Sequence, residues 1–209
     1  MASLKEIQVS EFLDSLSSDG KIPAGGSTAA LAGALAASLT SMVSSIVYSK
    51  VGDNPALQVD MKNYAQRAEH LRLMLEGCID EDAKMYELLM DAYHLPKDLD
   101  GRTERLQRAL RNAASVPMKV ATLSCKVIEL CNELYPQVKG LKISEVGVAA
   151  MMAVSAIQGA TLSVKINTYM IKDRDFADRQ NKQVDSLETK YLPIAKEVYK
   201  AVTDRVTKK

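Results

Sequence analysis

The 209-residue chain lacks tryptophan, has only two phenylalanines and two histidines, and carries a formal net charge of +1. Its lysines, arginines and acids are interleaved, so the sequence offers no basic surface for a nucleic acid or an anionic membrane. His70 and His94 are far apart, and neither has a nearby cysteine or carboxylate at the spacing of metal ligands. We therefore expect no nucleic-acid partner, no membrane partner and no metal site.

Cysteine is scarce as well. Cys78, Cys125 and Cys131 are odd in number and show no paired spacing. The first residues also lack the basic segment, apolar run and small-residue cleavage site of a secretory signal. These features are typical of a reducing compartment, so we expect a cytoplasmic protein whose three thiols pack inside helices.

Several catalytic motifs are missing. No serine lies in a Gly-x-Ser-x-Gly elbow, and the glycine pair near the N-terminus is not followed by Gly-Lys-Ser. Their absence argues against a nucleophile-elbow hydrolase and a P-loop nucleoside triphosphatase. No segment alternates with the period of a strand. The sequence therefore predicts an all-α protein, with residues 1–209 forming a single domain.

Prolines and glycines divide this domain into helical blocks, without an internal repeat or an obvious linker. Pro117 and Pro193 fall inside blocks and should bend or split them. We expect a bundle of about six helices, over residues 9–18, 28–50, 56–94, 102–134, 144–172 and 175–206.

Two uncharged stretches, Thr28–Val47 and Val146–Val164, have about the length that spans a bilayer. They are rich in alanine, serine, glycine and threonine, which contribute little to transfer into lipid, so we interpret both as helices buried in protein. Small residues recur every fourth position in each stretch, which lets helix backbones approach closely. We expect these two helices at the centre of the bundle, and a homodimer would cover their remaining apolar surface.

The junction before the first of these helices reads Pro23-Ala24-Gly25-Gly26-Ser27. Paired glycines allow a sharp turn and a close approach, and Ser27 can cap the following helix. The N–H groups at such a helix start suit a carboxylate, a phosphate or a polarised carbonyl. The alternative is a tight loop before a buried helix.

Three further places break the core pattern. Asp82 interrupts an apolar stripe and should face inward, either as a structural acid held by a lysine or a cap, or as an acid–base group with a raised pKa. Glu145 lies in the first turn after Ser144, where the helix dipole alone favours an acid. Lys165 and Asn167, at the end of an uncharged helix, can reach either solvent or a shared site.

Four separated motifs resemble the cyclodeaminase/cyclohydrolase family, which comprises the formiminotetrahydrofolate cyclodeaminase domain and the free-standing methenyltetrahydrofolate cyclohydrolases. The resemblance covers almost the whole chain in the family's order. The motifs are the segment from Pro23 through the alanine-rich helix start, Asp80-x-Asp82-Ala83 running on to Lys97, Ala114-Ser-Val-Pro117, and Ser144 to Ala150 through Val164-Lys-Ile-Asn167.

The resemblance implies an all-helical homodimer with a folate site between helices and no cofactor beyond the tetrahydrofolate substrate. By position, Pro23, Gly25, Gly26 and Ser27 would form the turn that binds folate, Asp82 and Glu145 would be the catalytic acids, and Lys165 and Asn167 would orient the pterin or the glutamate tail. The chain departs from the family at Ala24, where a third glycine is usual, and at Glu145, where aspartate is usual.

The resemblance also implies one of two reactions on the one-carbon unit that bridges N5 and N10. We favour hydrolysis of 5,10-methenyltetrahydrofolate to 10-formyltetrahydrofolate, because the sequence carries no formiminotransferase domain to supply a cyclodeaminase. Cyclodeamination with release of ammonia is the alternative. A non-catalytic helical dimer that binds folate or another protein is the alternative from a different class.

Overall fold

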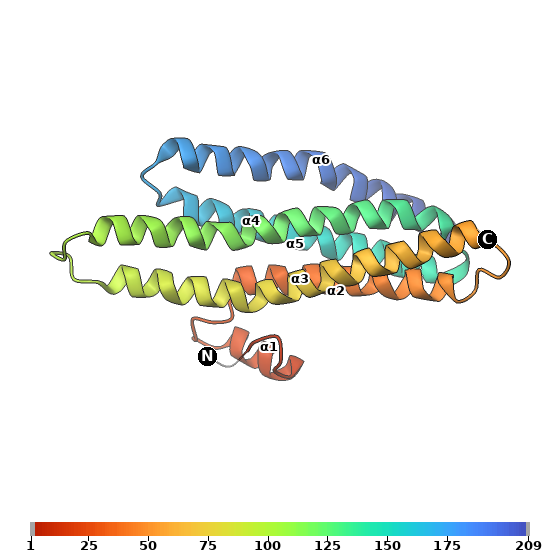
Figure 1. Cartoon of the computed structure of the whole chain (residues 1–209), viewed down its shortest axis with the longest axis horizontal. Helices are drawn as coiled ribbons and strands as arrows, with labels where there is room; N and C mark the ends of the chain where they lie inside the picture. The colour runs from red at the N-terminus through yellow and green to blue at the C-terminus, as the bar shows by residue number, and fades with distance from the viewer. Residues whose placement is uncertain (1–2, 208–209) are drawn as a thin grey trace.

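The computed structural model describes residues 3–207, and over that range the protein is a bundle of six α-helices without a strand (Figure 1). The all-α prediction is confirmed. The helices are α1 (Val9–Ser17), α2 (Gly25–Tyr48), α3 (Pro55–His94), α4 (Arg102–Leu134), α5 (Ile143–Tyr169) and α6 (Arg174–Thr207), with two short 3-10 turns, Tyr135–Gln137 and Gly140–Lys142, between α4 and α5.

The five long helices run lengthwise along the bundle, whereas short α1 lies to one side of it (Figure 1). Successive long helices reverse direction, so the start of α2, the second half of α3 and the end of α5 are found toward the same end. Helix α2 packs against α3, α4 and α5, and α5 packs against α2, α4 and α6. The two small-residue helices therefore contact each other inside the bundle, as the sequence predicts, and α4 shares this central position.

Local signals set most helix boundaries. Asn54 caps α3, because its side-chain oxygen accepts the N–H of Leu57 at 3.2 Å, and Pro55 takes the first helical position. Gly101, at φ 72°, begins α4 in a conformation that favours glycine. Pro193 lies inside α6 without dividing it into two helices.

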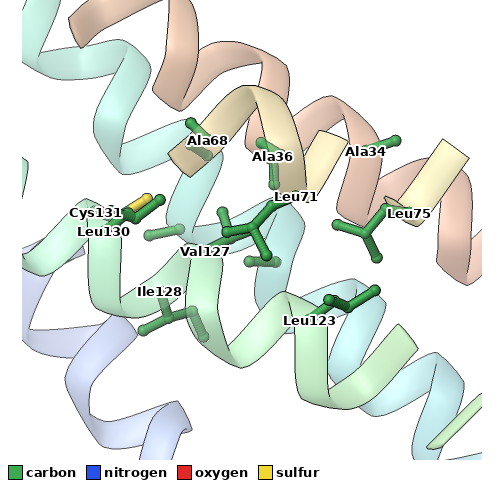
Figure 2. Close-up of a cluster of buried hydrophobic side chains, with 14 of the residues drawn as sticks. Ala34, Ala36, Ala68, Leu71, Leu75, Leu123, Val127, Ile128, Leu130 and Cys131 are labelled. Atoms are coloured by element: carbon green, nitrogen blue, oxygen red, sulfur yellow. The ribbon is translucent and has the colours of Figure 1, made fainter. Parts of the chain in front are cut away.

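The core shows how small residues set the spacing between helices (Figure 2). Ala36 of α2 points toward larger side chains of α3 and α4, among them Leu71 and Val127. At the contact of α2 with α5, a Cβ added to Gly159 would lie 3.3 Å from the Cβ of Ala29. This approach leaves no room for longer side chains, which explains the rows of alanine, glycine and serine.

The three cysteines are buried and unbridged. Burial raises the pKa of Cys78 and Cys131 to about 11 and that of Cys125 to about 12. Because the thiolate is the reactive form, these thiols pack as small apolar groups.

Helices α2 and α5 leave one side uncovered. By length and composition alone, both are long and apolar enough to cross a membrane. In the most apolar 18 residues of each, 44% and 50% are buried in the bundle. Exposed side chains on them include Leu35 and Met42 of α2 and Val148, Leu162 and Ile166 of α5. This two-helix surface, called here the α2–α5 face, carries large apolar groups that the single chain does not cover.

Candidate acid–base site

Asp82 lies on α3 directly against the first turn of α2. Its carboxylate Oδ2 accepts a hydrogen bond from the hydroxyl of Ser27 at 3.0 Å. Gly26 makes the approach possible, because a Cβ at this position would meet three carboxyl atoms of Asp82, the Oδ2 atom at 2.6 Å. Gly26, but not Gly25, is thus required here for close contact between α2 and α3, and Asp82 faces inward as the sequence predicts.

Ser27 does not cap α2 as expected. The helix begins at Gly25, Ala24 occupies the N-cap position without a side-chain hydrogen bond, and the N–H of Thr28 already bonds the Ala24 carbonyl at 3.0 Å. Ser27 is therefore the third helical residue, and its side chain points to α3. The carboxyl of Asp82 takes the place of the missing cap, since it also accepts from the Ser27 backbone N–H.

The Ser27 hydroxyl is placed to serve both protonation states of Asp82. It carries one hydrogen, yet two acceptors lie within reach: Asp82 Oδ2 at 3.0 Å and the Ile79 carbonyl oxygen at 3.1 Å. When Asp82 is ionised, Ser27 donates to it. When Asp82 is protonated, Ser27 donates to Ile79 and accepts from Asp82, so the carboxyl keeps a partner as it gains or loses a proton.

Burial raises the pKa of Asp82 above its ordinary value, and the hydrogen bonds from the side chain and backbone of Ser27 oppose that shift without cancelling it. No lysine or arginine forms an ion pair with Asp82 in the part of the chain that the structure describes. The lysine-bound alternative is therefore wrong. A carboxyl with a raised pKa and no cationic partner is suited to proton transfer.

A cavity of about 570 Å³ adjoins Asp82, between the start of α2, the second half of α3 and the end of α5. Most of its wall is apolar, from Met85, Leu89, Leu162, Ile166 and others. Its full lining is Ala24, Gly25, Gly26, Asp82, Met85, Tyr86, Leu89, Ala113, Leu162, Ser163, Ile166, Asn167 and Met170. The volume falls in the range of small-molecule sites.

The start of α2 opens into this cavity. Among residues 3–207, the backbone N–H groups of Gly25 and Gly26 have no hydrogen-bond partner, and a Cβ at Gly25 would meet no atom within 4 Å. Two free donors at the positive end of a 24-residue helix therefore lie beside Asp82. Such donors suit an oxygen that carries or develops negative charge.

Asn167 brings the end of α5 into the same cavity. Its side-chain nitrogen donates to the Ser163 carbonyl at 2.8 Å and to the Ala113 carbonyl at 3.4 Å. Because both bonds use the amide nitrogen, the side-chain oxygen is left as an acceptor for a ligand N–H. The structure thus brings Gly25, Gly26, Asp82 and Asn167 together around one space.

Lys165, which was expected to share the site, lies outside it. Its ammonium group forms an ion pair with Asp185 of α6, with 2.7 Å between Nζ and Oδ1, and this contact raises the pKa of Lys165. Two positions separate Lys165 from Asn167, a spacing that turns the two side chains to different faces of α5. The cavity wall includes Asn167 and not Lys165.

Glu145 is also placed elsewhere. It lies in the first turn of α5, 3.9 Å from the ammonium of Lys142, and 22 residues of helix, about 33 Å, separate it from Asn167. Within one chain Glu145 and Asp82 therefore do not form a pair of catalytic acids. Nor does Ser144 cap α5, which begins at Ile143.

The remaining positions of the N-terminal junction are accounted for by backbone geometry. Ala24 has φ −137° and ψ −167°, an extended conformation that any residue adopts, so the alanine does not strain the turn. Pro23 is buried just before α2 and is not part of the cavity wall.

Sequence reasoning missed Tyr86. This residue lies one helical turn after Asp82 and lines the cavity together with Met85 and Leu89. Its position four residues after an inward-facing acid was a usable signal, because residues at i and i+4 share a helix face.

These features define a class of protein: an all-helical bundle that holds a half-buried carboxyl with a raised pKa beside a free helix N-terminus in an apolar cavity. A family model described as formiminotransferase-cyclodeaminase matches residues 8–186. The chain belongs to this formiminotransferase-cyclodeaminase family.

Individual proteins with related names are similar to this chain over most of its length. The chain is 31% identical to the methenyltetrahydrofolate cyclohydrolase of Methylorubrum extorquens, over 95% of this chain and 97% of that protein. It is 29% identical to the formimidoyltransferase-cyclodeaminase of Rattus norvegicus, over 88% of this chain but only 35% of that longer protein. The crystal structure of formiminotetrahydrofolate cyclodeaminase from Thermotoga maritima superposes with a TM-score of 0.87 at 26% identity, covering 97% of this chain and 99% of the other.

Proposed function

We propose that this protein is an enzyme that hydrolyses 5,10-methenyltetrahydrofolate to 10-formyltetrahydrofolate, with Asp82 as its acid–base group. The observation that carries the proposal is the Asp82 carboxyl, which lies against the free start of α2 in an apolar cavity. Its likeness to the Methylorubrum extorquens cyclohydrolase over nearly the full length of both chains supports this choice of substrate.

The geometry supports a reaction in two proton steps. Ionised Asp82 opposes the positive charge of the methenyl group and takes a proton from the water molecule that adds to the methenyl carbon. The carbon is then tetrahedral, bonded to a hydroxyl and to both nitrogens. Protonated Asp82 gives its proton to N5 as the bond between that carbon and N5 breaks. The hydroxyl loses its proton to solvent water as the formyl group forms on N10, so the positive charge of the substrate leaves as this released proton.

The surrounding groups match these steps. The two acceptors of the Ser27 hydroxyl keep Asp82 hydrogen-bonded before and after it takes the proton. The N–H groups of Gly25 and Gly26 can bind the oxygen that becomes the formyl oxygen. The free side-chain oxygen of Asn167 can accept an N–H of the pterin ring, which orients the substrate.

The same site can serve formiminotetrahydrofolate cyclodeamination, and the likeness to the Thermotoga maritima cyclodeaminase structure favours this second candidate. In that reaction N10 attacks the formimino carbon and ammonia leaves. Asp82 would take the proton from N10 and deliver it to the departing nitrogen, so both reactions need one carboxyl that can change protonation state.

The test compares both substrates with one protein preparation. We expect purified protein to remove the absorbance of 5,10-methenyltetrahydrofolate faster than the spontaneous reaction, without releasing ammonia from 5-formiminotetrahydrofolate. Ammonia release with production of the methenyl chromophore would show the cyclodeaminase. Activity on neither substrate, with folate still bound, would show the non-catalytic binding protein.

We further propose that two copies associate through the α2–α5 face. Leu35, Met42 and Val148 are 47%, 37% and 50% exposed on this face, and a second copy would remove such groups from water. A mass equal to one chain in the ultracentrifuge at micromolar concentration would contradict this. If the dimer forms, Met42→Glu should dissociate it, because it places a charge in the interface.

The proposed enzyme uses no cofactor beyond its tetrahydrofolate substrate, since the proton steps require only Asp82 and water. We place it in the cytoplasm, in keeping with its three buried free thiols. Its partners are the folate substrate and a second copy of the chain, without nucleic acid or membrane.

A further inference from the structure

A separate pocket lies on the α3–α4 side of the bundle. Its volume is about 530 Å³, which falls in the range of small-molecule sites. The residues that line it come from the middle of the two helices, between Gln66 and Met74 on α3 and between Leu123 and Glu129 on α4. It shares no lining residue with the Asp82 cavity, and neither of its helices carries the α2–α5 face. This α3–α4 pocket therefore belongs neither to the proposed reaction site nor to the proposed dimer surface.

The floor of the α3–α4 pocket is apolar. Leu71 of α3 and Leu123 of α4, both labelled in Figure 2, are 6% and 4% exposed, and half-buried Met74 lines the pocket with them. A ligand that covers this floor removes apolar surface from water, and the methionine sulfur makes favourable contacts with an aromatic ring. The floor therefore suits a large apolar or aromatic group.

Two groups of opposite charge lie above this floor on α4, and they are not paired with each other. Lys126 forms no ion pair among residues 3–207, and neither does Glu129, three positions later. Residues at this spacing lie on one helix face, about 5–6 Å apart at their Cβ atoms. The pocket thus presents an ammonium group and a carboxylate side by side, each available to a ligand.

The carboxylate of Glu129 is held in position from behind. The hydroxyl of buried Tyr191 in α6 donates to its Oε1 atom at 2.6 Å, and the ammonium of Lys190 donates to the Tyr191 oxygen at 3.0 Å. These two bonds use one carboxylate oxygen and leave Oε2 as an acceptor. A carboxylate that is already oriented loses less side-chain entropy when it binds a ligand.

Helix α3 adds polar groups on the opposite wall. Arg67 is already paired with Glu133, with 2.9 Å between the two side chains, whereas His70 forms no ion pair in the part of the chain that the structure describes. His70 and Gln66 both line the pocket and carry N–H groups that can donate to an oxygen of the ligand.

Such a lining suits a ligand that carries both charges close together on an apolar body. In an α-amino acid a single carbon separates the carboxylate from the ammonium group, so the two charges can meet neighbouring groups of opposite sign on α4. A simple anion would be repelled by Glu129, and a simple cation would be repelled by Lys126.

We propose that the α3–α4 pocket binds a free α-amino acid with a large apolar side chain. Its carboxylate lies between Lys126 and His70, its ammonium group donates to Oε2 of Glu129, and its side chain covers Leu71 and Leu123. This site is additional to the proposed folate function and does not depend on it.

The first experiment titrates L-phenylalanine into isotope-labelled full-length protein and follows the amide signals by NMR. We expect saturable shifts with a Kd of about 1 mM or tighter, which is usual for a ligand of this size. Phenylpropionate lacks the ammonium group, phenethylamine lacks the carboxylate and L-alanine lacks the apolar body, so each should bind at least about fivefold more weakly. Equal binding of phenylpropionate or phenethylamine, or no saturation by L-phenylalanine up to about 20 mM, would overturn the proposal.

The second experiment repeats the titration with Lys126→Gln, Glu129→Gln and Lys62→Gln. Glu129→Gln keeps an oxygen that can accept from Tyr191, so the packing of α6 is preserved. Lys62 is an exposed lysine of α3 outside the pocket and serves as the matched control. We expect each pocket variant to weaken L-phenylalanine binding by about three- to tenfold and the control to leave it unchanged, with equal helical content by circular dichroism. Unchanged affinity in both pocket variants, or an equal loss in the control, would refute the assignment.

Discussion

Replacing Gly26 by alanine should disable the enzyme without unfolding it. The new Cβ would lie 2.6 Å from Oδ2 of Asp82 and closer still to the other carboxyl oxygen, whereas ordinary contact begins at 3.4 Å. The carboxyl must therefore retreat by about 1 Å, a displacement that can cost about 100-fold in rate, or about 3 kcal/mol of transition-state stabilisation. The retreat also breaks the hydrogen bond to Ser27 that holds the carboxyl in place.

The assay is the loss of absorbance of 5,10-methenyltetrahydrofolate, with circular dichroism to confirm an unchanged helical content. Gly77→Ala is the matched control: Gly77 lies on the same helix as Asp82, and a Cβ there meets no atom within 4 Å. We expect the control to retain wild-type kcat. A Gly26→Ala enzyme within threefold of wild type would refute the reasoning, because it would mean that Asp82 can move without consequence.

Further predictions concern stability and the residues outside the cavity. Gly77→Ala should stabilise the fold by about 0.5–1 kcal/mol in urea unfolding, because alanine has less conformational freedom to lose in a helix. Gly33→Ala should instead destabilise the fold by about 1–3 kcal/mol, since a Cβ at residue 33 would lie 2.8 Å from the hydroxyl oxygen of Ser124 and 2.9 Å from a methyl group of Leu75. Asp82→Asn should raise the melting temperature at neutral pH and lose that advantage in acid. The reason is that folding raises the pKa of Asp82 above its ordinary value of 3.8. The contribution of Asp82 to the free energy of unfolding is therefore greatest below pH 3.8 and is lost as the pH rises through the folded-state pKa. Equal pH profiles of stability for the wild type and Asp82→Asn would contradict this. Lys165→Met should leave kcat and KM unchanged, because its ammonium group binds Asp185 rather than substrate, and a loss of activity beyond threefold would place Lys165 in the site after all.

The hydrophobic periodicity of the sequence and the positions of its prolines and glycines were sufficient to predict the fold. The predicted range 102–134 coincides with α4, and α3 differs from its predicted range only by starting at Pro55. The errors lie at helix ends: α5 ends at Tyr169 rather than at residue 172, and at the starts of α2 and α5 a serine was assigned as a cap. Ser27 and Ser144 both lie inside their helices, because the first-turn N–H groups found other partners or none. Capping by a residue from another helix, as Asp82 does for α2, has no signature in the local sequence.

Only those features of the candidate site that depend on the pattern within one helix could be predicted from the sequence. Asp82 stood out because it interrupts an apolar stripe, and its contact with Gly26 follows from the need for close approach. Lys165 and Glu145 could not be placed, since their positions depend on which face of α5 meets α6 and on the direction in which α5 runs. Asp185, the partner of Lys165, comes from a helix that the sequence alone does not dock.

The most direct test of the account is the rate of the Asp82→Asn variant on 5,10-methenyltetrahydrofolate, measured together with its affinity for the substrate. Asparagine keeps the shape of the side chain and a hydrogen-bond acceptor for Ser27 but cannot carry a proton between water and N5. We predict a fall in kcat of about 10²- to 10⁴-fold with affinity within a few-fold of wild type. A variant that retains kcat within tenfold would contradict the claim that Asp82 transfers the proton.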